Sequence, residues 1–270
     1  MPYADLNGAH IHYTDTGGDG APIVFSHGLL FSGEMFEAQV AHFSAQGYRC
    51  ITFDHRGQGQ SGVTEDGYDM DTLTEDAAQL IAHLGVSPCH FAGLSMGGFV
   101  GMRLAVRRSE VLKSLILLET SADPEPEENR SKYLKLNFVA RWIGLWAVIN
   151  KVMPIMFSQS YLNDPNKAVE RDRWKKLLVG NHKIGITRAV LGVTHREPVF
   201  EELGGIDLPT LVVVGDEDVA TVPAKSERIH GAIRGSELVV IPKAGHSSTV
   251  EQPDAVNAVL ERFLGVQAEG

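Results

Sequence analysis

Cysteine and positive charge are both scarce in this sequence. Two cysteines among 270 residues exclude a disulfide-stabilised scaffold. Only 24 Lys and Arg stand against 34 Asp and Glu, which gives a net charge of −10. Because phosphate groups need a positive surface, this balance argues against a nucleic-acid partner. Hydrophobic residues at 43% and charged residues at 21% are ordinary for a globular chain.

Long apolar runs are also missing. Polar residues and a proline interrupt the most apolar region, residues 138–157, so no run reaches the roughly 18 residues of a membrane span. Residues 1–16 lack the basic start and the apolar stretch of a signal peptide. We therefore expect a soluble, cytoplasmic protein with no nucleic-acid and no membrane partner.

Short apolar runs alternate with helical patterns along most of the chain. A strand is predicted over residues 9–15, after an Asn7-Gly8 turn. Continuous apolar runs indicate strands covered on both faces, as in a parallel sheet. They are residues 23–25, 50–53, 90–92, 114–118, 210–214 and 238–241. Apolar residues at helical spacing mark residues 34–46, 71–84, 96–107 and 253–264. This alternation predicts an α/β fold with a mostly parallel sheet.

One long segment, residues 122–205, breaks the alternation. It contains no good strand, opens with a polar stretch at residues 123–128, and continues with helical patterns rich in Trp and Met. This predicts a helical insertion after the fourth parallel strand, which ends near Glu119. The remaining residues, 1–121 and 206–270, would form the core. The inserted helices either cover the core or form a lid over a pocket, and the motifs described next favour a lid.

The motif Gly93-Leu94-Ser95-Met96-Gly97 follows one predicted strand and precedes a predicted helix. In this context a sharp turn lifts a serine hydroxyl out of the sheet, and small flanking residues let the backbone come close. The N-terminus of the following helix favours developing negative charge. An isolated motif of this type would more often be a helix start with a serine cap. Here Ser95 is predicted to be a nucleophile because its partners are present.

A serine nucleophile needs a base, and the base needs a carboxylate that sets its tautomer. His246 follows the run 238–241, and Asp218 follows the run 210–214. The order Ser, Asp, His along the chain is the one expected for this architecture. Asp216 and Glu119 are the alternatives for the acid, because both also follow predicted strands.

Acyl transfer also needs two backbone N–H groups that point at the oxyanion. Met96, the residue after the nucleophile, would supply one. Leu29, which follows His27-Gly28 at the end of the run 23–25, would supply the other. The side chain of His27 is predicted to be an ordinary loop histidine, since the backbone does the chemistry.

These motifs together resemble those of α/β-hydrolase-fold serine hydrolases, in the group of bacterial carboxylesterases, enol-lactonases and cofactor-free haloperoxidases. The resemblance covers essentially the whole chain and is weakly specific for substrate. It implies an α/β-hydrolase fold, a mostly parallel twisted sheet flanked by helices, with a helical cap after the strand that ends near Glu119. Serine instead of aspartate at position 95 departs from haloalkane dehalogenases and epoxide hydrolases. The motifs that carry the resemblance are residues 27–28, 54–61, 93–98, 215–218 and 244–246.

Two further patterns suggest other chemistry and are set aside. Residues 57–62 match the G-x-G-x-x-G pattern of dinucleotide sites, but no helix opens at these glycines, and the resemblance implies a tight loop beside the active site. His10 and His12 share one face of a strand without a third metal ligand nearby. We therefore expect no metal and no cofactor. Arg56, the nearest cation to the site, is predicted to form a structural ion pair with loop acids.

The family's strand order implies that Cys50 and Cys89 stay reduced. It places the strand that carries His27 between theirs, and two strand spacings of about 9–10 Å exceed the roughly 7 Å Cα separation that a disulfide spans.

The substrate pocket is predicted to lie between the sheet and the lid. Its expected lining residues are Leu29, Leu30, Phe31, Met35, Phe36, Met96, Trp142, Trp146, Met153, Phe157 and Val219. The expected activity is hydrolysis of a small to medium apolar carboxylic ester without a metal, with perhydrolysis as a side reaction. A lactonase with the same residues is the alternative, and a ligand receptor with slow hydrolysis is a third. The expected partner is a small-molecule ester or lactone, and the expected state is a monomer or a small homo-oligomer.

Overall fold

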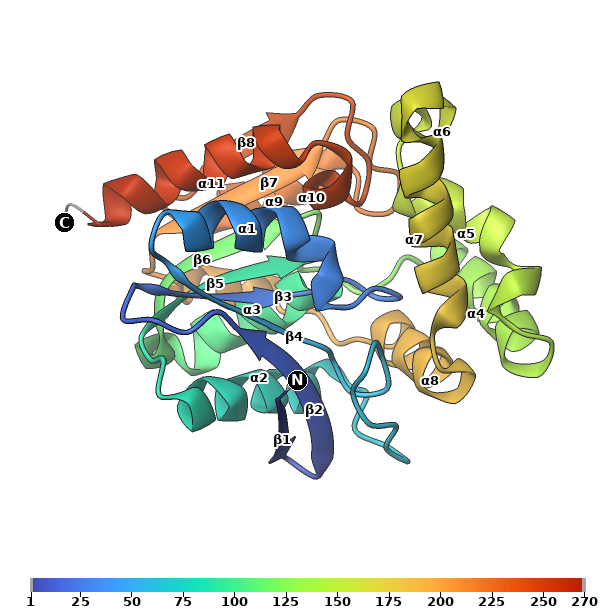
Figure 1. The fold of residues 1–270 in the computed structure, drawn as a ribbon, viewed down its shortest axis with the longest axis horizontal. Coiled ribbons are helices and arrows are strands. Elements are labelled where there is room, and N and C mark those ends of the chain that lie inside the picture. Colours follow the sequence, from blue (N-terminus) through green and yellow to red (C-terminus); the bar gives the residue numbers. More distant parts are fainter. Residues whose placement is uncertain (1, 269–270) are drawn as a thin grey trace.

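A computed structural model describes residues 2–268 of the chain. Eight strands form one twisted sheet in the order β1-β2-β4-β3-β5-β6-β7-β8 (Figure 1). β1 pairs antiparallel with β2, and β2 pairs antiparallel with β4, whereas every other pairing is parallel. The strands are Tyr3–Leu6 (β1), Ala9–Asp15 (β2), Pro22–Ser26 (β3), Arg49–Phe53 (β4), Cys89–Leu94 (β5), Leu112–Leu118 (β6), Thr210–Gly215 (β7) and Glu237–Ile241 (β8).

Helices cover both faces of this sheet. The helices are Glu37–Ala45 (α1), Met70–Leu84 (α2), Met96–Arg107 (α3), Glu127–Trp142 (α4), Ile149–Met156 (α5), Gln159–Asn163 (α6), Ala168–Gly180 (α7), Lys183–Thr194 (α8), Pro223–Ala232 (α9), Ser248–Glu251 (α10) and Pro253–Ala268 (α11). Successive strand residues point to opposite faces, so Ile23 and Phe25 pack on the side of α1 and α11, and Val24 packs on the side of α2, α3 and α9. The predicted α/β layering is therefore confirmed.

The predicted strands all occur, but one strand and two α-helices outside the predicted insertion were not predicted. One of them, α10, is a single turn in which only Val250 is apolar. β1 has only four residues with alternating burial, which is too short for a clear periodic signal. α9 buries only Ser226 and Ile229 among its ten residues, so its sequence shows no apolar stripe. The predicted helix over residues 34–46 is a 3₁₀ turn, Gly33–Phe36, followed directly by α1.

The order of the strands has a switch point at β3. The chain passes from β3 to β4 on one side of β3 and then crosses to β5 on its other side. Open α/β sheets bind their ligands at such a point, beyond the carboxyl ends of the strands. Ser26 at the end of β3 is in register with Gly93 near the end of β5, so the loops that follow these two strands start side by side.

The long segment between β6 and β7 consists of helices α4 to α8, which all fall within the predicted insertion. These helices lie beyond the carboxyl ends of the strands, at the right of the molecule in Figure 1. We call α4 to α8 the cap. Among the residues described, no helix is long and apolar enough to cross a bilayer.

Candidate active site

Ser95 sits at the sharp turn between β5 and α3. Its backbone has φ +53° and ψ −109°, a conformation that costs energy for a residue with a side chain. Two glycines permit the turn, because a Cβ at Gly93 would overlap the backbone of Gly97, and a Cβ at Gly97 would overlap the carbonyl of Ser26. A hydrogen bond of 2.9 Å from the Ser95 N–H to the Leu118 carbonyl helps to hold this turn.

His246 and Asp218 lie beside this serine in a continuous hydrogen-bonded chain. His246 Nε2 is 2.9 Å from Ser95 Oγ, and His246 Nδ1 is 2.9 Å from Asp218 Oδ2. An ionised carboxylate only accepts hydrogen bonds, so Nδ1 carries the proton and Nε2 is free to accept the serine proton. All three side chains are buried, with relative exposures of 8% or less. The structure thus brings together the three residues predicted from the sequence.

The carboxylate of Asp218 is held on both oxygens. Oδ1 accepts the backbone N–H groups of Ala220, 2.8 Å, and Thr221, 3.0 Å, while Oδ2 accepts the Thr221 hydroxyl at 2.7 Å as well as His246. Burial acts to raise the pKa of Asp218, but the His246 charge and these hydrogen bonds outweigh it and lower that pKa below its usual value. Asp218 is therefore an ionised partner for an imidazolium.

The two alternative acids occupy different places. Asp216 is exposed. Glu119 is completely buried at the end of β6, with a positive φ of +42°. Among the described residues, no hydrogen bond joins its carboxyl group to His246. Burial raises the pKa of Glu119 well above its usual range, and the nearby charges of Asp218 and Glu251 add to this. Glu119 is thus a neutral acid, which could not stabilise an imidazolium by its charge.

The loop after β3, residues 27–31, lies next to Ser95, and we call it the oxyanion loop. A Cβ built on Gly28 would stand 3.5 Å from the Cβ of Ser95, so the Gly28–Leu29 peptide borders the nucleophile. His27 braces the loop from inside: its Nε2 accepts the His55 N–H at 2.9 Å, and its Nδ1–H donates to the Gly28 carbonyl at 2.8 Å. Burial lowers the pKa of His27, which keeps this ring neutral.

Leu30 is held in a left-handed conformation, φ +76°, by contacts on both of its backbone groups. Its N–H donates to Gln58 Oε1 at 2.9 Å, and its carbonyl accepts from Asn181 Nδ2 of the cap at 2.6 Å. Gln58 Nε2 also lies 3.8 Å from the sulfur of Met96. Gln58 therefore touches both segments that were predicted to supply oxyanion donors. The Leu29 N–H has no protein acceptor among the hydrogen bonds of the described residues.

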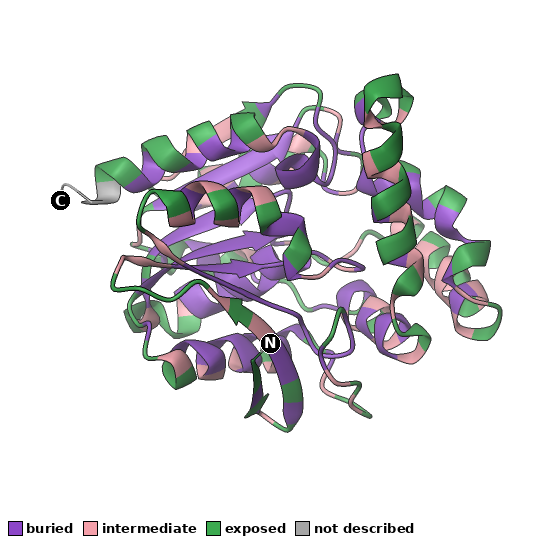
Figure 2. Ribbon diagram, in the orientation of Figure 1, coloured by how far each residue is buried: buried purple, intermediate pink, exposed green. Residues whose placement is uncertain are grey.

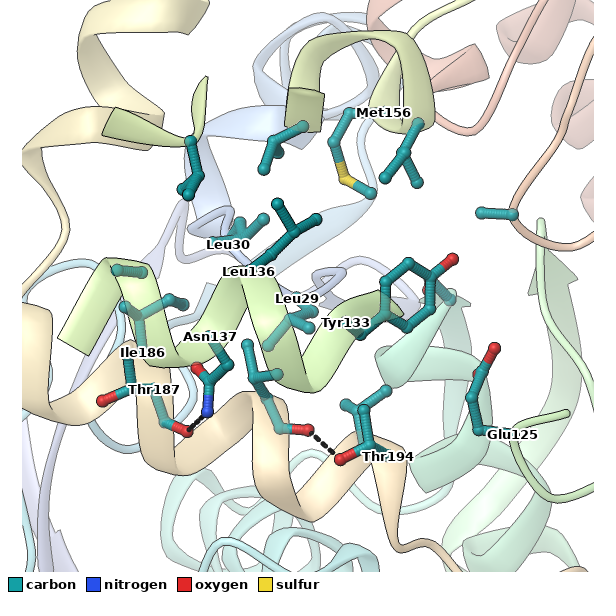
Figure 3. A pocket seen from close by; sticks show the side chains of 18 of the residues that line it. Leu29, Leu30, Glu125, Tyr133, Leu136, Asn137, Met156, Ile186, Thr187 and Thr194 are labelled. Atoms are coloured by element: carbon teal, nitrogen blue, oxygen red, sulfur yellow. Dashed lines mark hydrogen bonds between the residues drawn. The ribbon is translucent and has the colours of Figure 1, made fainter. Parts of the chain in front are cut away.

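A cavity of about 110 Å³ opens over Ser95 and His246. Its walls are almost entirely apolar and come mainly from the cap. Figure 3 shows that side chains of α4 and α8, two helices that pack against each other, line it together with Leu29 and Leu30 of the oxyanion loop. The cap side chains labelled there are Tyr133, Leu136, Asn137, Met156, Ile186, Thr187 and Thr194. Ser95 and His246 thus border a small, largely apolar cavity.

Comparison with known proteins places this fold and site in a family. The family model described as the alpha/beta hydrolase fold matches residues 21–253. The chain belongs to the α/β-hydrolase fold family. It is similar to the solved structure of the enol-lactonase from Burkholderia xenovorans LB400, with 30% sequence identity and a TM-score of 0.91, covering 98% of this chain and 100% of that one.

Two other similar proteins are named for different activities. A thermophilic esterase from Thermogutta terrifontis is 28% identical with a TM-score of 0.91, covering 99% of both chains. A non-heme haloperoxidase from Rhodococcus erythropolis is 28% identical over 98% of this chain and 99% of its own length. The predicted resemblance to this group is therefore confirmed, and the protein is an α/β hydrolase.

Several predicted pocket residues do not line the cavity of this hydrolase. Trp142, Trp146 and Val219 are 71%, 66% and 61% exposed, so these predictions were wrong. Helical spacing shows which residues share a face but not which face turns inward. On α4 the inner face carries Tyr133 and Ala140, whereas Phe138 and Trp142 lie on the outer face.

The other residues that were predicted to line the pocket are buried in the hydrophobic core and do not reach the cavity. They are Phe31, Met35, Phe36, Met96, Met153 and Phe157. Phe31, for example, packs edge-on against Trp174 of α7, with ring centroids 5.7 Å apart. Their side chains pack within the two hydrophobic clusters, on either side of the sheet, instead of lining the cavity. Of the predicted lining residues, Leu29 and Leu30 do border the cavity.

The two patterns set aside at the start have structural roles. The glycines of residues 57–62 lie in a loop, and the next helix, α2, begins only at Met70. His12 Nδ1 pairs with Asp54 at 3.0 Å, and among the described residues no group of three ligands fits a metal ion. Arg56 forms a buried ion pair, as predicted, but its partner is Asp76 on α2 rather than a loop acid.

The cysteine prediction is also confirmed. Cys50 on β4 and Cys89 on β5 are both free and buried, separated by β3. Burial raises the pKa of each thiol to about 12.

One important residue escaped the sequence reasoning. Glu251, on α10, is buried and accepts the N–H groups of Gly245, 3.1 Å, and Ser247, 3.2 Å, on either side of His246. It also accepts the N–H of Ser158 in the cap at 2.9 Å. Glu251 therefore orients the histidine loop and ties it to the cap. Its only sequence signal is its spacing five residues after His246, which by itself has no chemical meaning.

Proposed function

We propose that this α/β hydrolase cleaves small apolar carboxylic esters through an acyl-enzyme on Ser95. The observation that supports this most directly is the chain of hydrogen bonds from Asp218 through His246 to Ser95 at the floor of an apolar cavity. The same arrangement serves acyl transfer on several unrelated folds.

In the proposed reaction, Ser95 Oγ attacks the ester carbonyl while His246 Nε2 takes its proton. The imidazolium that forms is stabilised by the ionised carboxylate of Asp218, which also keeps Nδ1 protonated. The oxyanion is placed between the N–H of Met96, whose position as the first residue of α3 leaves it without a helical acceptor, and the N–H of Leu29. His246 then protonates the leaving alcohol and activates the water that releases the acid.

The size and polarity of the cavity support small apolar substrates. Its volume of about 110 Å³ is well below the roughly 300–1,000 Å³ of pockets that enclose drug-sized ligands. Its walls are mostly leucine, valine, isoleucine and alanine side chains, which favour a short hydrocarbon acyl group.

Lactone hydrolysis is the second candidate. The machinery would be the same, because a lactone is a cyclic ester whose leaving alcohol stays attached. This candidate is favoured by the similarity to the enol-lactonase from Burkholderia xenovorans LB400 over 98% of the chain.

The experiment is steady-state hydrolysis of aryl esters from acetyl to dodecanoyl, with a set of lactones alongside, in the presence of EDTA. We expect turnover that is highest for short acyl chains and is abolished in Ser95→Ala. EDTA-resistant turnover that survives in Ser95→Ala would contradict the nucleophile assignment. Turnover that EDTA removes would contradict a metal-independent reaction.

A matched pair of variants tests the acid. In Asp218→Asn, the Ala220 and Thr221 N–H groups would hold the amide oxygen in the place of Oδ1, so the NH₂ would face His246. Nδ1 would then accept, Nε2 would carry the proton, and the histidine could not take the proton of Ser95. We expect kcat to fall by about 10⁴-fold, as in other serine hydrolases of this type. Asp216→Asn, at the exposed neighbouring acid, is the control and should leave kcat unchanged.

A further inference from the structure

The outer side of α4 and the turn after it expose large apolar side chains. Phe138, Trp142, Ile143 and Trp146 are 66%, 71%, 58% and 66% exposed, and we call these four residues the aromatic face. The rings of Phe138 and Trp142 lie 6.4 Å apart, and Ile143 and Trp146 follow closely in the chain, where Trp146 packs against Gly144. Together they present apolar surface on the order of 400 Å². Single exposed apolar residues need no explanation, but a patch of this size marks an interaction site.

This face is the outer side of the helix that roofs the cavity. Tyr133 and Ala140, on the opposite side of α4, line the cavity over Ser95. Figure 2 shows exposed residues along the outward sides of the cap helices, away from the sheet. No other segment in the described part of the chain covers the aromatic face. A partner that covers it would therefore be another molecule.

The charge around this face is opposite to that of the whole protein. Residues 129–163 contain five Lys and Arg and no Asp or Glu, in a chain whose net charge is −10. Lys132 and Lys135 are exposed on α4, and no salt bridge to either occurs among the described residues. Lys135 and Phe138 border the same shallow surface groove. The aromatic face is thus flanked by free cations.

We propose that the aromatic face docks this protein onto an anionic lipid surface. Tryptophan and phenylalanine on one side of a helix, with lysines beside them, are typical of helices that lie in the membrane interface. The indole ring suits that zone because it is largely apolar but carries one N–H donor. The lysines add attraction to anionic headgroups.

Charge argues against a second copy of this chain as the occupant. A symmetric dimer places the same surface of each copy against the other. Pairing through the aromatic face would therefore bring together two segments that both carry an excess of positive charge. An anionic lipid surface supplies charges of the opposite sign.

Surface docking is compatible with the lack of a membrane span. The sequence analysis expected no membrane partner because no segment is long and apolar enough to cross a bilayer. Binding in the interface needs only one exposed apolar face and flanking cations. Docked in this way, the protein would hold the roof of its apolar cavity against the lipid.

The experiment measures binding of the full-length protein to large unilamellar vesicles. Vesicles of mixed phosphatidylcholine and phosphatidylglycerol are compared with vesicles of phosphatidylcholine alone, by co-sedimentation and by quenching of tryptophan fluorescence with brominated lipid. Trp142 and Trp146 would be quenched, since the third tryptophan, Trp174, is buried. The test variants are the pair Trp142→Ser with Trp146→Ser and the pair Lys132→Glu with Lys135→Glu.

Two control variants match the test variants in kind. Val169→Ser removes an apolar side chain that is 85% exposed on another cap helix, and Lys113→Glu reverses an exposed charge on β6. We expect wild type and controls to bind the anionic vesicles and to release them as salt rises. Each double variant should weaken binding by about tenfold or more.

Three results would overturn the proposal. One is that the wild type binds neither kind of vesicle, and another is that the tryptophan pair can be replaced without loss of binding. The third is that the wild type self-associates through this face, seen as a concentration-dependent dimer in sedimentation equilibrium that the tryptophan variant does not form. None of these readouts depends on catalytic activity, so they are independent of the proposed ester hydrolysis.

Discussion

Replacing Asn181 should slow the chemical step although this side chain lies in the cap and does not touch the reacting atoms. Asn181 Nδ2 donates to the Leu30 carbonyl at 2.6 Å and so holds the oxyanion loop from outside. The same loop is held from inside by Gln58 and His27. Asn181→Leu removes this hydrogen bond, together with the 3.2 Å contact of Nδ2 with the Leu178 carbonyl at the end of α7, and keeps a side chain of similar size.

The magnitude follows from two contributions. A typical hydrogen bond contributes about 0.5–1.5 kcal/mol net, and the left-handed conformation of Leu30, φ +76°, costs roughly 1–2 kcal/mol that its neighbours must offset. Losing the bond at Asn181 therefore lets Leu30 relax and turns the Leu29 N–H away for part of the time. Complete loss of an oxyanion donor costs about 10²–10³ in kcat. With the Gln58 contact intact, we expect a smaller fall of about tenfold, which corresponds to 1.4 kcal/mol.

The assay separates positioning from general damage. On a short aryl ester, kcat should fall about tenfold while KM changes little, because the ground-state ester makes no full oxyanion contact. The inhibition constant of a matching trifluoromethyl ketone, which forms a tetrahedral adduct with the serine, should rise by the same factor. Asn181→Gln keeps the donor and should restore part of the activity.

Asn150→Ala provides the matched control. It removes a cap asparagine whose side chain, among the described residues, hydrogen-bonds only to Lys175, at 3.1 Å, and it should leave all these constants unchanged. The reasoning is refuted if Asn181→Leu raises KM alone, or leaves the ketone affinity as in wild type. A fall in kcat accompanied by an equal loss in the control would show that the cap, and not this hydrogen bond, is responsible.

Three further predictions concern stability. Glu119 has a raised pKa because of burial, so the folded state binds its proton more tightly than the unfolded state, and wild type should lose stability as the pH rises above the ordinary pKa of a glutamate. Glu119→Gln should flatten this decline, which urea unfolding between pH 5 and 9 measures; parallel curves would be contrary evidence. Asp76→Ala leaves the buried guanidinium of Arg56 unpaired and should cost about 3–5 kcal/mol in the same assay, whereas a loss under 1 kcal/mol would show that the pair is dispensable. Gly93→Ala should prevent folding or abolish activity, because its Cβ would overlap the backbone of the turn at Ser95. Gly231→Ala, with open space around its Cβ, should be tolerated. Circular dichroism and activity distinguish the two variants, and a fully active Gly93→Ala would contradict the geometry.

Much of the fold and the central site could be predicted because their signals are local. Seven of the strands appear in the sequence as apolar runs or as alternation. A strand covered on both faces buries successive side chains, so its residues are apolar one after another. Ser95, Asp218 and His246 stood out because each follows such a run, and the carboxyl ends of parallel strands meet at one edge. β1, α9 and α10 were missed because each buries too few apolar side chains to leave a pattern.

The class of fold and the three residues proposed for acyl transfer could therefore be predicted from the sequence alone. Only the tertiary structure decided how these residues are supported. Glu251, Gln58 and Asn181 each contact a backbone group that is distant in the chain, and a backbone partner leaves no mark in a sequence. The orientation of α4 was likewise decided by packing. Helical spacing showed that Phe138 and Trp142 share a side of the helix, but only the neighbouring helices determined that this side faces outward.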